Sequence, residues 1–438
     1  MRIALVSAVF PPEPQPSSVM AAELASAWVR AGHEVTVIAP VPNRPQGAVY
    51  PGFERRLWAS TSFAGARCLR VRSWLIGERR RAVDRVLENV TFGLGSAAAL
   101  LVQSRPDVVI VETWPILAAA TVVAECAARG IPVVNYIKDI FPEAATAAGI
   151  VPSDSMLTRA LLRLDRWVCH RADVNVVISE RAAAFLARSR RLPAAKVASI
   201  PDWLDLTAIA PTDGGPAWRK EVGLGPDERV FMFAGTMGHA SRVDILVSVA
   251  EKLRHRQHIR LVCVGQGVLK PRMAAEIERL GLKNLVLLPF QQRERVPDMQ
   301  SAADAMLLTT SADMGLTSVP NKLITYLAMG KPVVCAAPPE TDVAALVKEH
   351  DLGVVVPPED PSRLAEAIEW MAGQDRTWLA ATGQRARSMA LERYSLPSAL
   401  ARFDRLFGAL GLPSAPKSHA GAAAERPAGA RAVIGSEG

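Results

Sequence analysis

The stretch VPNKLITYLAMGKPVV, residues 319–334, contains a short helical pattern that leads directly into a strand. Leu323, Tyr326 and Leu327 recur at the spacing of one helix face, behind a proline that suits a helix start. Gly330 ends this pattern, and the β-branched pair that closes the stretch is typical of a buried strand. A helix followed at once by such a strand predicts an α/β domain with a parallel sheet.

The same alternation of strand and helix extends along the chain in both directions. In the first half, short apolar runs typical of buried strands occupy residues 2–9, 34–39, 108–112, 132–136, 174–178 and 197–200. In the second half they occupy residues 230–233, 261–264, 285–288, 305–308, 333–335 and 353–356. Helical patterns of the first half lie at residues 19–30, 83–103, 118–128, 157–171 and 181–188. Apolar strands separated by helices predict parallel sheets that helices cover on both faces.

A chain of 438 residues that is 50% hydrophobic is long enough for two domains. The two runs of alternation meet at residues 202–216, which are rich in Pro, Gly and Asp. We therefore expect an α/β protein of two Rossmann-like, doubly wound parallel-sheet domains, at residues 1–203 and 204–388. A helix at 389–412 is expected to cross back to the first domain. Residues 413–438, which lack aromatic side chains, are expected to form a disordered tail.

The cysteines and the N-terminus indicate a cytoplasmic protein. The five cysteines are widely spaced, which argues for a reducing compartment and against structural zinc or disulfide bonds. The first ten residues carry one charge and a short apolar run before Pro11, so they predict a strand and not a secretion signal. The charge-free stretches at 89–104 and 113–124 are too short, or are broken by Pro115, to predict a transmembrane helix.

Positive charge is concentrated in the first half of the chain. The net charge is +8, and residues 1–203 hold 24 Lys and Arg against 17 Asp and Glu. Nine arginines between Arg55 and Arg85 are interleaved with Trp58, Trp74 and aliphatic side chains. This mixture suits an anionic membrane surface as well as it suits nucleic acid. An ordinary solvated face is the plainer interpretation of such a charge run, and it stays open.

Open parallel sheets bind ligands at the carboxyl ends of their strands, so the loops at those ends are candidate sites. AGTMGHASRVDIL, residues 234–246, follows the first strand of the second half and has Gly235 and Gly238 around a turn into a helix. Glycines let a ligand approach the backbone closely, and a helix start offers unpaired N–H groups to an anion. The next such loop has Lys270 at the start of another helix, which alone is a weak signal.

Lys322 is the third candidate, because it lies in the first turn of the helical pattern that follows Pro320. A cation at that end opposes the helix dipole, which favours positive charge at the other end. A bound anion would neutralise Lys322 and remove this conflict. The alternative is that Lys322 points into water, where the penalty is small.

Longer motifs follow in one order along the chain. In the first half they are FPPEPQPSSVMAAELASAWVRAGHEVTVIAP (10–40), RPDVVIVETWP (105–115), IKDIFPEAATAAGI (137–150) and IPDWLDL (200–206). In the second half they are FAGTMG (233–238), VGQGVLKPRMAAEIERLGLKNLVLLPF (264–290), AADAMLL (302–308), VPNKLITYLAMGKPVV (319–334) and GVVVPPEDPSRLAEAI (353–368). By these motifs the chain resembles retaining glycosyltransferases of family 4, with the GT-B fold. Within that family it resembles the N-acetylfucosamine-transferase-like branch of bacterial surface-polysaccharide enzymes.

The resemblance implies two domains that face a central cleft, the second binding a nucleotide-diphospho-sugar and the first binding a lipid-linked glycan acceptor. It implies sugar transfer with retention of configuration, for cell-surface polysaccharides, by a peripheral protein on the inner face of the cytoplasmic membrane. The implied partners include an anionic membrane surface and no nucleic acid. In the family's usual mechanism the acceptor attacks from the front face, and the leaving diphosphate assists removal of the acceptor proton. Such chemistry needs charge stabilisation on the diphosphate, and we expect no metal or other cofactor because no Asp-x-Asp pair is present.

The resemblance also implies roles for individual residues. It places the donor site at Gly235, Thr236, Gly238, Arg242, Lys270, Phe290, Lys322 and Thr325. It places the acceptor site at Ser17, Ser18, Lys138 and Glu143. It gives catalytic roles to Asp139, which faces the reacting sugar, and to Lys322, which binds the diphosphate.

The sequence departs from the family pattern at several of these positions. Thr317 and Thr325 stand where the family has two glutamates, the second of which holds the nucleotide's ribose. A neutral hydroxyl loses a charge-assisted hydrogen bond, worth about 1.5–3 kcal/mol. The other replaced positions are Thr236 and Ser241 for an Arg and a Lys of the phosphate loop, Ser17 and Ser18 for a glycine pair, and Lys138 for a His. We infer that this branch relies on Lys322 and backbone amides to bind the diphosphate.

Other nucleotide-binding classes fit less well. A nicotinamide dehydrogenase would have Gly-x-Gly-x-x-Gly after its first strand, where this chain has no glycine. A P-loop nucleotidase would need a further glycine upstream of Gly330. Two alternatives stay open: a nucleotide-sugar epimerase or hydrolase of the same fold, and a non-catalytic membrane-associated partner. The first would turn over its donor without an acceptor, and the second would bind no nucleotide.

Overall fold

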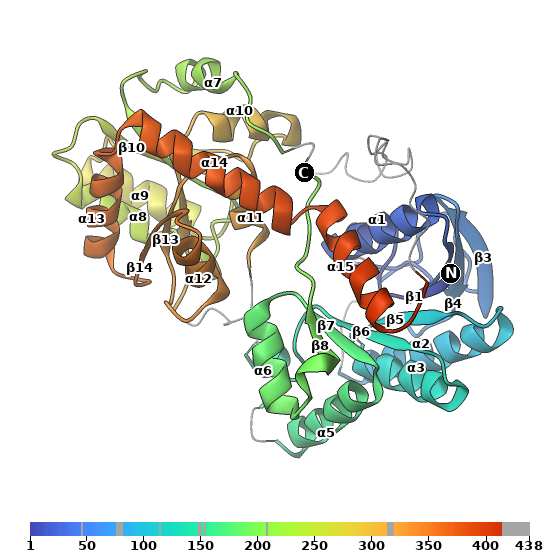
Figure 1. Cartoon of the computed structure of the whole chain (residues 1–438). Helices are drawn as coiled ribbons and strands as arrows, with labels where there is room; N and C mark the ends of the chain where they lie inside the picture. Colours follow the sequence, from blue (N-terminus) through green and yellow to red (C-terminus); the bar gives the residue numbers. More distant parts are fainter. Residues whose placement is uncertain are drawn as a thin grey trace. The chain divides into compact units, whose positions relative to one another are not determined.

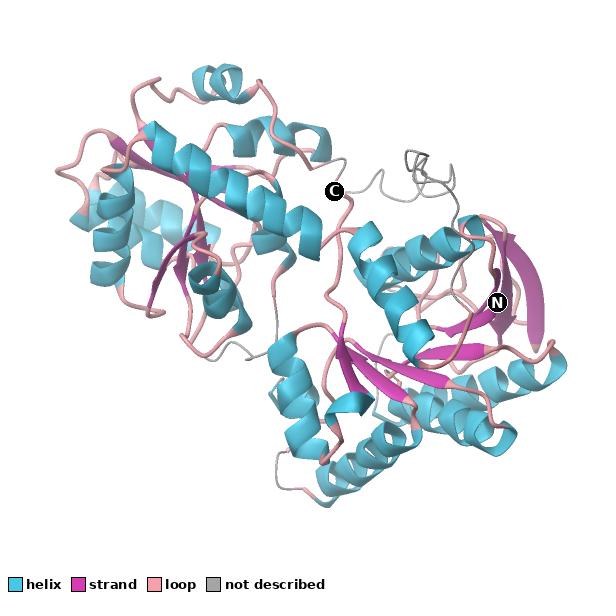
Figure 2. Cartoon of the chain, viewed as in Figure 1, coloured by secondary structure: helices cyan, strands magenta, loops and turns pink. Residues whose placement is uncertain are grey.

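The computed structural model describes residues 1–413 except 45–46, 76–81, 114, 148–150, 153–154, 207–208 and 313–318. Residue contacts divide the chain into two compact units, one formed by Met1–Pro201 with Ala399–Gly438 and the other by Asp202–Ser398. Each unit contains a sheet flanked by helices (Figures 1 and 2). From residue 414 onward, the expected disordered tail lies outside the described residues.

The first unit is built on an eight-stranded sheet with the order β3-β4-β2-β1-β5-β6-β7-β8. Its strands are β1 (Arg2–Val6), β2 (Glu34–Pro40), β3 (Trp58–Phe63), β4 (Ala66–Val71), β5 (Val108–Glu112), β6 (Val133–Ile137), β7 (Val174–Val177) and β8 (Val197–Ser199). Neighbouring strands are parallel except for β3 and β4. In the centre, Ile3 of β1 is in register with Val35 of β2 and Val108 of β5. The parallel sheet predicted from the six apolar runs is therefore confirmed.

The antiparallel pair β3 and β4 is a feature that the sequence did not predict, because residues 55–85 read as an arginine-rich surface segment. In the structure Arg70 of β4 is only 3% exposed. Its guanidinium donates to the carbonyl of Pro40 (3.2 Å) and lies over the rings of Phe10 and Phe53, 5.4 and 5.3 Å from their centroids. This arginine therefore stabilises the interior of the unit and is not available to a surface partner.

Helices cover both faces of the first sheet. They are α1 (Pro16–Arg30), α2 (Ala82–Val102), α3 (Ile116–Arg129), α4 (Glu143–Ala147), α5 (Met156–Arg171), α6 (Glu180–Arg190), η1 (Ala194–Lys196) and α15 (Leu396–Ala409). α2, α3 and α5 share a buried cluster that includes Val133 of β6. Tyr136 faces the opposite side of the sheet, because side chains alternate along a strand. There Phe403 of α15 packs edge-on against Tyr136 (5.8 Å) and Trp28 of α1 (5.5 Å).

The second unit is built on a six-stranded parallel sheet with the order β11-β10-β9-β12-β13-β14. Its strands are β9 (Arg229–Ala234), β10 (Ile259–Val264), β11 (Leu285–Leu288), β12 (Ala305–Thr309), β13 (Val333–Ala336) and β14 (Gly353–Val356). Alternate residues of β9 enter two different buried clusters, with Val230 and Met232 in one and Phe231 and Phe233 in the other. Both faces are therefore covered, as the unbroken apolar runs predicted.

The second unit's helices pack against these two clusters. They are α7 (Gly215–Glu221), η2 (His239–Ser241), α8 (Ile245–Lys252), α9 (Lys270–Leu280), η3 (Arg293–Arg295), α10 (Val296–Ser301), α11 (Asn321–Ala328), α12 (Asp342–Glu349), α13 (Pro361–Ala372) and α14 (Arg376–Arg393). The segment expected as one helix at 389–412 is divided between α14 and α15. Pro397 explains the division, because a proline cannot continue a helix through its interior but fits the first turn of a new one.

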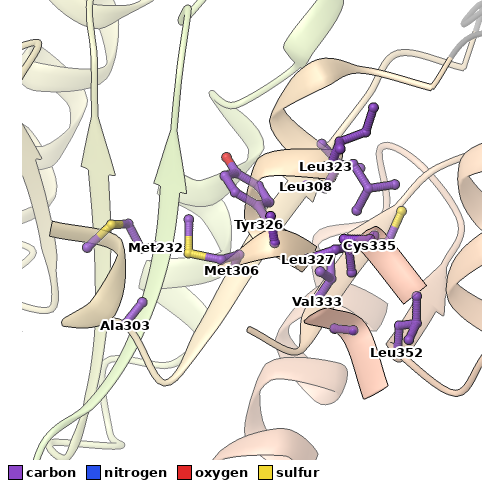
Figure 3. Close-up of a cluster of buried hydrophobic side chains, with 14 of the residues drawn as sticks. Met232, Ala303, Met306, Leu308, Leu323, Tyr326, Leu327, Val333, Cys335 and Leu352 are labelled. Carbon is purple, nitrogen blue, oxygen red and sulfur yellow. The ribbon is translucent and has the colours of Figure 1, made fainter. Parts of the chain in front are cut away.

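One buried side chain fixes α11 to the sheet. Tyr326 is fully buried among the apolar side chains of the cluster drawn in Figure 3. Its hydroxyl accepts a hydrogen bond from the Ala234 N–H (2.9 Å) and donates one to the Ala234 carbonyl (2.8 Å). β12 pairs with β9 only at Phe231 and Met232, so on this side Tyr326 takes the place of a strand partner at the end of β9.

Replacing Tyr326 by Phe is expected to lower the free energy of unfolding of the second unit by about 1–3 kcal/mol. The physical reason is that both polar groups of Ala234 lose their partner inside a packed core. Urea unfolding followed by circular dichroism would measure the change. Tyr50→Phe is the control, since it removes one bond from a partly exposed hydroxyl. A loss no larger than that of the control would contradict the role given to Tyr326.

Candidate functional site

Two loops at the carboxyl ends of β9 and β10 lie in direct backbone contact. Gly235 N–H donates to the Val264 carbonyl (2.9 Å), so strand pairing continues into the loops. Gly265 has φ +151°, and a Cβ on it would lie 2.0 Å from the Gly235 carbonyl oxygen. Gly267 has φ +152°, and a Cβ there would lie 2.3 Å from the Met237 oxygen. Only glycine fits at these two positions, so the loops present backbone and not side chains.

Lys322 lies beside these loops. A Cβ built on Gly235 would lie 3.5 Å from the Lys322 ammonium nitrogen, and that nitrogen lies 4.6 Å from the centre of the Phe233 ring. Burial lowers the pKa of the Lys322 ammonium. Among the residues that the structure describes, no carboxylate forms an ion pair with it. The site therefore holds a partly buried cation that the described part of the protein does not neutralise.

The start of α11 adds backbone donors next to this cation. Pro320 occupies the N-cap position, so no side chain caps the helix, and no acidic residue lies in its first turn. The first N–H groups of a helix lack partners within the helix and carry partial positive charge. The Gly235 loop, the start of α11 and the Lys322 ammonium thus form one region that favours a bound anion such as a phosphate.

The other residues predicted for the donor site differ in what their side chains contact. The Lys270 ammonium donates to the carbonyls of Gly265 (3.0 Å) and Leu288 (2.9 Å), so it ties two strand ends together. The Thr325 hydroxyl donates to the carbonyl of Asn321 one turn earlier (2.9 Å). Phe290, in the loop after β11, is 72% exposed. Lys270 thus lies against the second glycine loop, as predicted, but its ammonium already donates hydrogen bonds to backbone carbonyls.

The loop that follows Gly238 is held by β12 and by its own side chains. The Ser241 hydroxyl donates to the Gly238 carbonyl (2.7 Å), and the Thr309 hydroxyl donates to the Ser241 carbonyl (2.5 Å). Thr236 is exposed. Arg242 has a left-handed backbone (φ 44°) and loose ion pairs at 3.8 Å to Asp244 and 3.6 Å to Glu359. Thr317, the other replaced family position, lies outside the described residues.

The acceptor-site predictions lie in the first unit, which is described by itself. Asp139 follows β6 and is exposed. The Lys138 ammonium donates to the Tyr136 hydroxyl (2.8 Å) and lies over the Tyr136 ring (4.3 Å). Ser17 and Ser18 lie in the first turn of α1, and the Ser18 hydroxyl is fully buried without a hydrogen-bond partner among the described residues. The loop after β6 thus carries two of these residues, Lys138 and Asp139.

Glu143 makes a contact that sequence reasoning missed. Its two carboxylate oxygens accept hydrogen bonds from Arg190 at 2.7 Å each. Arg190, which is fully buried, also donates to Asp165 (2.5 Å) and to the Phe141 carbonyl (3.0 Å). Arg190 therefore connects α5 and α6 to the loop that carries Asp139. No local pattern signals this cluster, because Glu143 and Arg190 are 47 positions apart.

The charges of this cluster depend on one another. Burial raises the pKa of Asp165 to about 6, while the neighbouring Arg190 opposes that shift. The pKa of Arg190 is raised by hydrogen bonds and charge interactions with Glu143 and Asp165, although burial acts in the opposite direction. Asp165 is thus ionised at neutral pH and paired with a permanent cation.

A cavity of about 780 Å³ lies at the other edge of the second sheet, where strands begin. Asp304, which precedes β12, forms an ion pair with Arg219 (2.8 Å). Lys331, which precedes β13, donates to the carbonyls of Ser301 (2.9 Å) and Ala303 (2.6 Å), and burial lowers its pKa to about 8. These charged groups are satisfied within the protein, and the cavity is not part of the glycine-loop site.

Comparison with protein families gives two matches. Residues 17–208 match the family model described as Glycosyltransferase Family 4, and residues 228–374 match the one described as Glycosyl transferases group 1. The first match lies in the first unit apart from its last residues, and the second lies in the second unit. The glycine loops, Lys322 and Asp139 all fall inside the matched ranges.

Two curated relatives and one solved structure illustrate the similarity. The putative colanic acid biosynthesis glycosyl transferase WcaI of Escherichia coli is 24% identical, over 78% of this chain and 85% of its own length. The probable glycosyltransferase WbjE of Pseudomonas aeruginosa is 26% identical, over 68% of this chain and 74% of its own. HepE of Anabaena, solved in complex with UDP, is 14% identical with a TM-score of 0.64, over 94% of this chain and 100% of that one. At that identity the structural likeness shows a common fold.

Replacing Arg190 by Met is expected to lower the free energy of unfolding by about 3–5 kcal/mol, because it leaves the Asp165 carboxylate buried without a cationic partner. The double variant Arg190→Met/Asp165→Asn is expected to recover part of that loss. Chemical denaturation of the purified protein measures both.

Arg363→Met is the matched control for Arg190, since its ion pair with Glu366 is exposed and is worth about 0–1 kcal/mol. Similar losses in the two single variants would show that the buried cluster contributes no more than a surface pair.

Proposed function

Because this chain is a family 4 glycosyltransferase with the GT-B fold, we propose that it transfers a sugar from a nucleotide-diphospho-sugar to a lipid-linked glycan acceptor. The product belongs to cell-surface polysaccharide biosynthesis. Similarity to WcaI, whose name refers to colanic acid biosynthesis, supports this assignment, and so does the UDP in the related HepE structure. The finer assignment, to the N-acetylfucosamine-transferase-like branch, rests on the sequence motifs.

The Lys322 ammonium beside the Gly235 loop, which forms no ion pair with the described residues, is the observation that carries the donor assignment. A nucleotide-diphospho-sugar brings a diphosphate whose negative charge increases as the sugar leaves. Backbone amides and an ammonium held in fixed positions stabilise this charge without reorganising during the reaction. Lys322 therefore binds the diphosphate in the ground state and stabilises it further as a leaving group. Similar contacts from a divalent ion are not needed, and we propose a metal-independent reaction.

The retention of configuration is part of the same proposal. The acceptor hydroxyl attacks on the face from which the diphosphate leaves, and a diphosphate oxygen accepts its proton. In this scheme Asp139 needs only to face the sugar ring and stabilise the positive charge that develops on it. Arg190 acts through Glu143 and the Phe141 carbonyl as a positioning residue for the loop that carries Asp139.

A lipid-linked acceptor places the reaction at the inner face of the cytoplasmic membrane. The first half of the chain carries an excess of seven positive charges, which favours an anionic lipid surface. Arg55, Arg56, Arg67 and Arg72 are exposed, whereas Arg70 is buried. The membrane attraction proposed here is therefore electrostatic and excludes Arg70.

Replacing Lys322 by Ala is expected to weaken nucleoside diphosphate binding about 10- to 100-fold, since a hydrogen bond to a charged group is worth about 1.5–3 kcal/mol. A thermal-shift screen of UDP, ADP, GDP and dTDP would first identify the base. Calorimetry with that nucleotide, with and without EDTA, would then measure the affinity.

Lys252→Ala, an exposed lysine at the end of α8, is the control for charge alone. Wild-type affinity in the Lys322 variant would refute the donor assignment, and loss of binding in EDTA would refute the metal-independent reaction. Donor turnover without any acceptor would favour an epimerase or hydrolase instead.

Diphosphate binding is expected to depend on pH through Lys322. Burial lowers the pKa of the free ammonium, and a bound diphosphate favours its charged form. The affinity is therefore full below the lowered pKa and falls as the pH rises through it, with uptake of a proton on binding. Calorimetry in two alkaline buffers of different ionisation enthalpy would measure this uptake.

Lys322→Arg keeps its charge over this range and is expected to bind without proton uptake. Lys331, whose pKa burial also lowers, lies outside the site, so it is expected to contribute no difference between the two proteins. Equal proton uptake by wild type and variant would contradict the role of Lys322.

A further inference from the structure

One face of the helix α2 packs against the interior of the first unit. Phe92 is 2% exposed on this face. Gly93 lets α2 approach α3, because a Cβ on it would lie 2.8 Å from the Ala118 Cα. Gly95 does the same toward the sheet, with a Cβ that would lie 3.1 Å from the Val71 side chain. This face fixes α2 on the domain surface along its length.

The opposite face of α2 is apolar and exposed. Its exposed side chains are Val83 (62%), Val86 (52%), Leu87 (37%), Val90 (39%), Leu94 (61%) and Leu101 (62%). At 100° per residue these positions fall on one side of the helix, and Phe92 falls on the other. We call these six residues the α2 stripe. A continuous apolar surface of this kind on a soluble domain marks an interaction site.

The sequence analysis predicted no transmembrane helix, and among the described residues one helix is long and apolar enough to be considered. By length and composition alone, the segment Val83–Val102 could cross a membrane, with a mean hydropathy of 1.2. Its inner face nevertheless packs on α3 and β4, and crossing a bilayer would expose that interior. The geometry is instead that of a helix lying along an interface, with one face in the protein and the other outward.

Tryptophan and arginine side chains flank the α2 stripe. Trp74 is 44% exposed and is joined to α2 by two hydrogen bonds, from its N–H to the Thr91 hydroxyl (2.8 Å) and from its indole to Asp84 (3.0 Å). Trp58, at the start of β3, is 48% exposed and pairs across the hairpin with Val71, whose side chain lies against Gly95 of α2. Arg72, also exposed, lies between Trp74 and the strand β4 in sequence. Tryptophan and arginine at the edge of an aliphatic surface match the headgroup region of an anionic bilayer.

We propose that the α2 stripe inserts into the headgroup and upper acyl region of an anionic bilayer, with α2 parallel to the membrane plane. Trp58 and Trp74 then lie at the headgroup level, and Arg72 contacts lipid phosphates. This assigns a membrane-inserting element, whereas the proposed function requires only electrostatic attraction. It deepens the membrane localisation proposed above and does not rest on sugar transfer.

The salt dependence of vesicle binding distinguishes insertion of the α2 stripe from electrostatic attraction alone. Salt screens the attraction between exposed arginines and anionic lipid, but it does not weaken burial of aliphatic side chains. The full chain is expected to bind vesicles of phosphatidylglycerol and phosphatidylcholine at low salt, and to keep part of that binding at high salt. Vesicles of phosphatidylcholine alone are expected to bind less at low salt.

The test compares stripe variants in a vesicle flotation assay. Val90→Asn/Leu94→Gln is expected to lower vesicle partitioning by about tenfold or more, because full burial of one aliphatic side chain is already worth about that factor. The loss should include the salt-resistant part. Arg72→Gln is expected to reduce binding at low salt and to leave the salt-resistant part unchanged. Leu391→Gln, which changes an exposed leucine of α14 in the second unit, is the matched control.

Three further results distinguish membrane insertion from misfolding of the variant and from a subunit interface. Nucleoside diphosphate affinity should be unchanged in the stripe variants, which shows that the protein is folded and that donor binding stands apart from docking. Wild-type flotation of the Val90/Leu94 variant, or no flotation of the wild type, would overturn the inference and leave the proposed function untouched. A dimer in analytical ultracentrifugation that the same variant converts to a monomer would assign the α2 stripe to a subunit interface instead.

Discussion

The hydrogen bonds between the Tyr326 hydroxyl and both polar groups of Ala234 are the constraint on which the proposed donor site depends. They fix α11 against the end of β9 at a point where β12 has stopped pairing. Lys322 lies four residues before Tyr326, so both side chains project from the same face of α11. The position of the ammonium beside Gly235 therefore follows from a bond made one helical turn away.

The contrast among buried cations shows why Lys322 is distinctive. Arg190 is paired with two carboxylates, and Lys270 and Lys331 donate to backbone carbonyls. Lys322 has an aromatic ring and a glycine loop as its neighbours instead. Removing a cation from water is costly when no protein group compensates it, and an incoming anion supplies the missing compensation. Within the described residues, this uncompensated charge is the physical basis for the proposal that a diphosphate binds there.

The sequence predicted the sheets well because buried parallel strands are read from short continuous apolar runs. The strands at Val108–Glu112 and Leu285–Leu288 begin and end where those runs do. The β3–β4 hairpin lacks such a run, because polar side chains in β3 and two arginines in β4 interrupt it, and the sequence analysis missed this hairpin. Site geometry was predicted only where position in the fold decides it, as for the loop at Gly235. The partners of Glu143 and Lys270 depend on contacts between residues 47 and 18 positions apart, for which no local pattern exists.

The placement of α15 has a consequence for how the protein is made. Phe403 and Phe407 complete the core of the first unit against Trp28 and Tyr136, yet they lie near the end of the part of the chain that the structure describes. A ribosome must first synthesise all of Asp202–Ser398, which takes about 10 to 40 seconds at typical elongation rates. During that interval the nascent first unit exposes the aromatic surface that α15 later covers. Its biogenesis thus includes a period in which a chaperone has a defined surface to shield, before the closing helix leaves the exit tunnel.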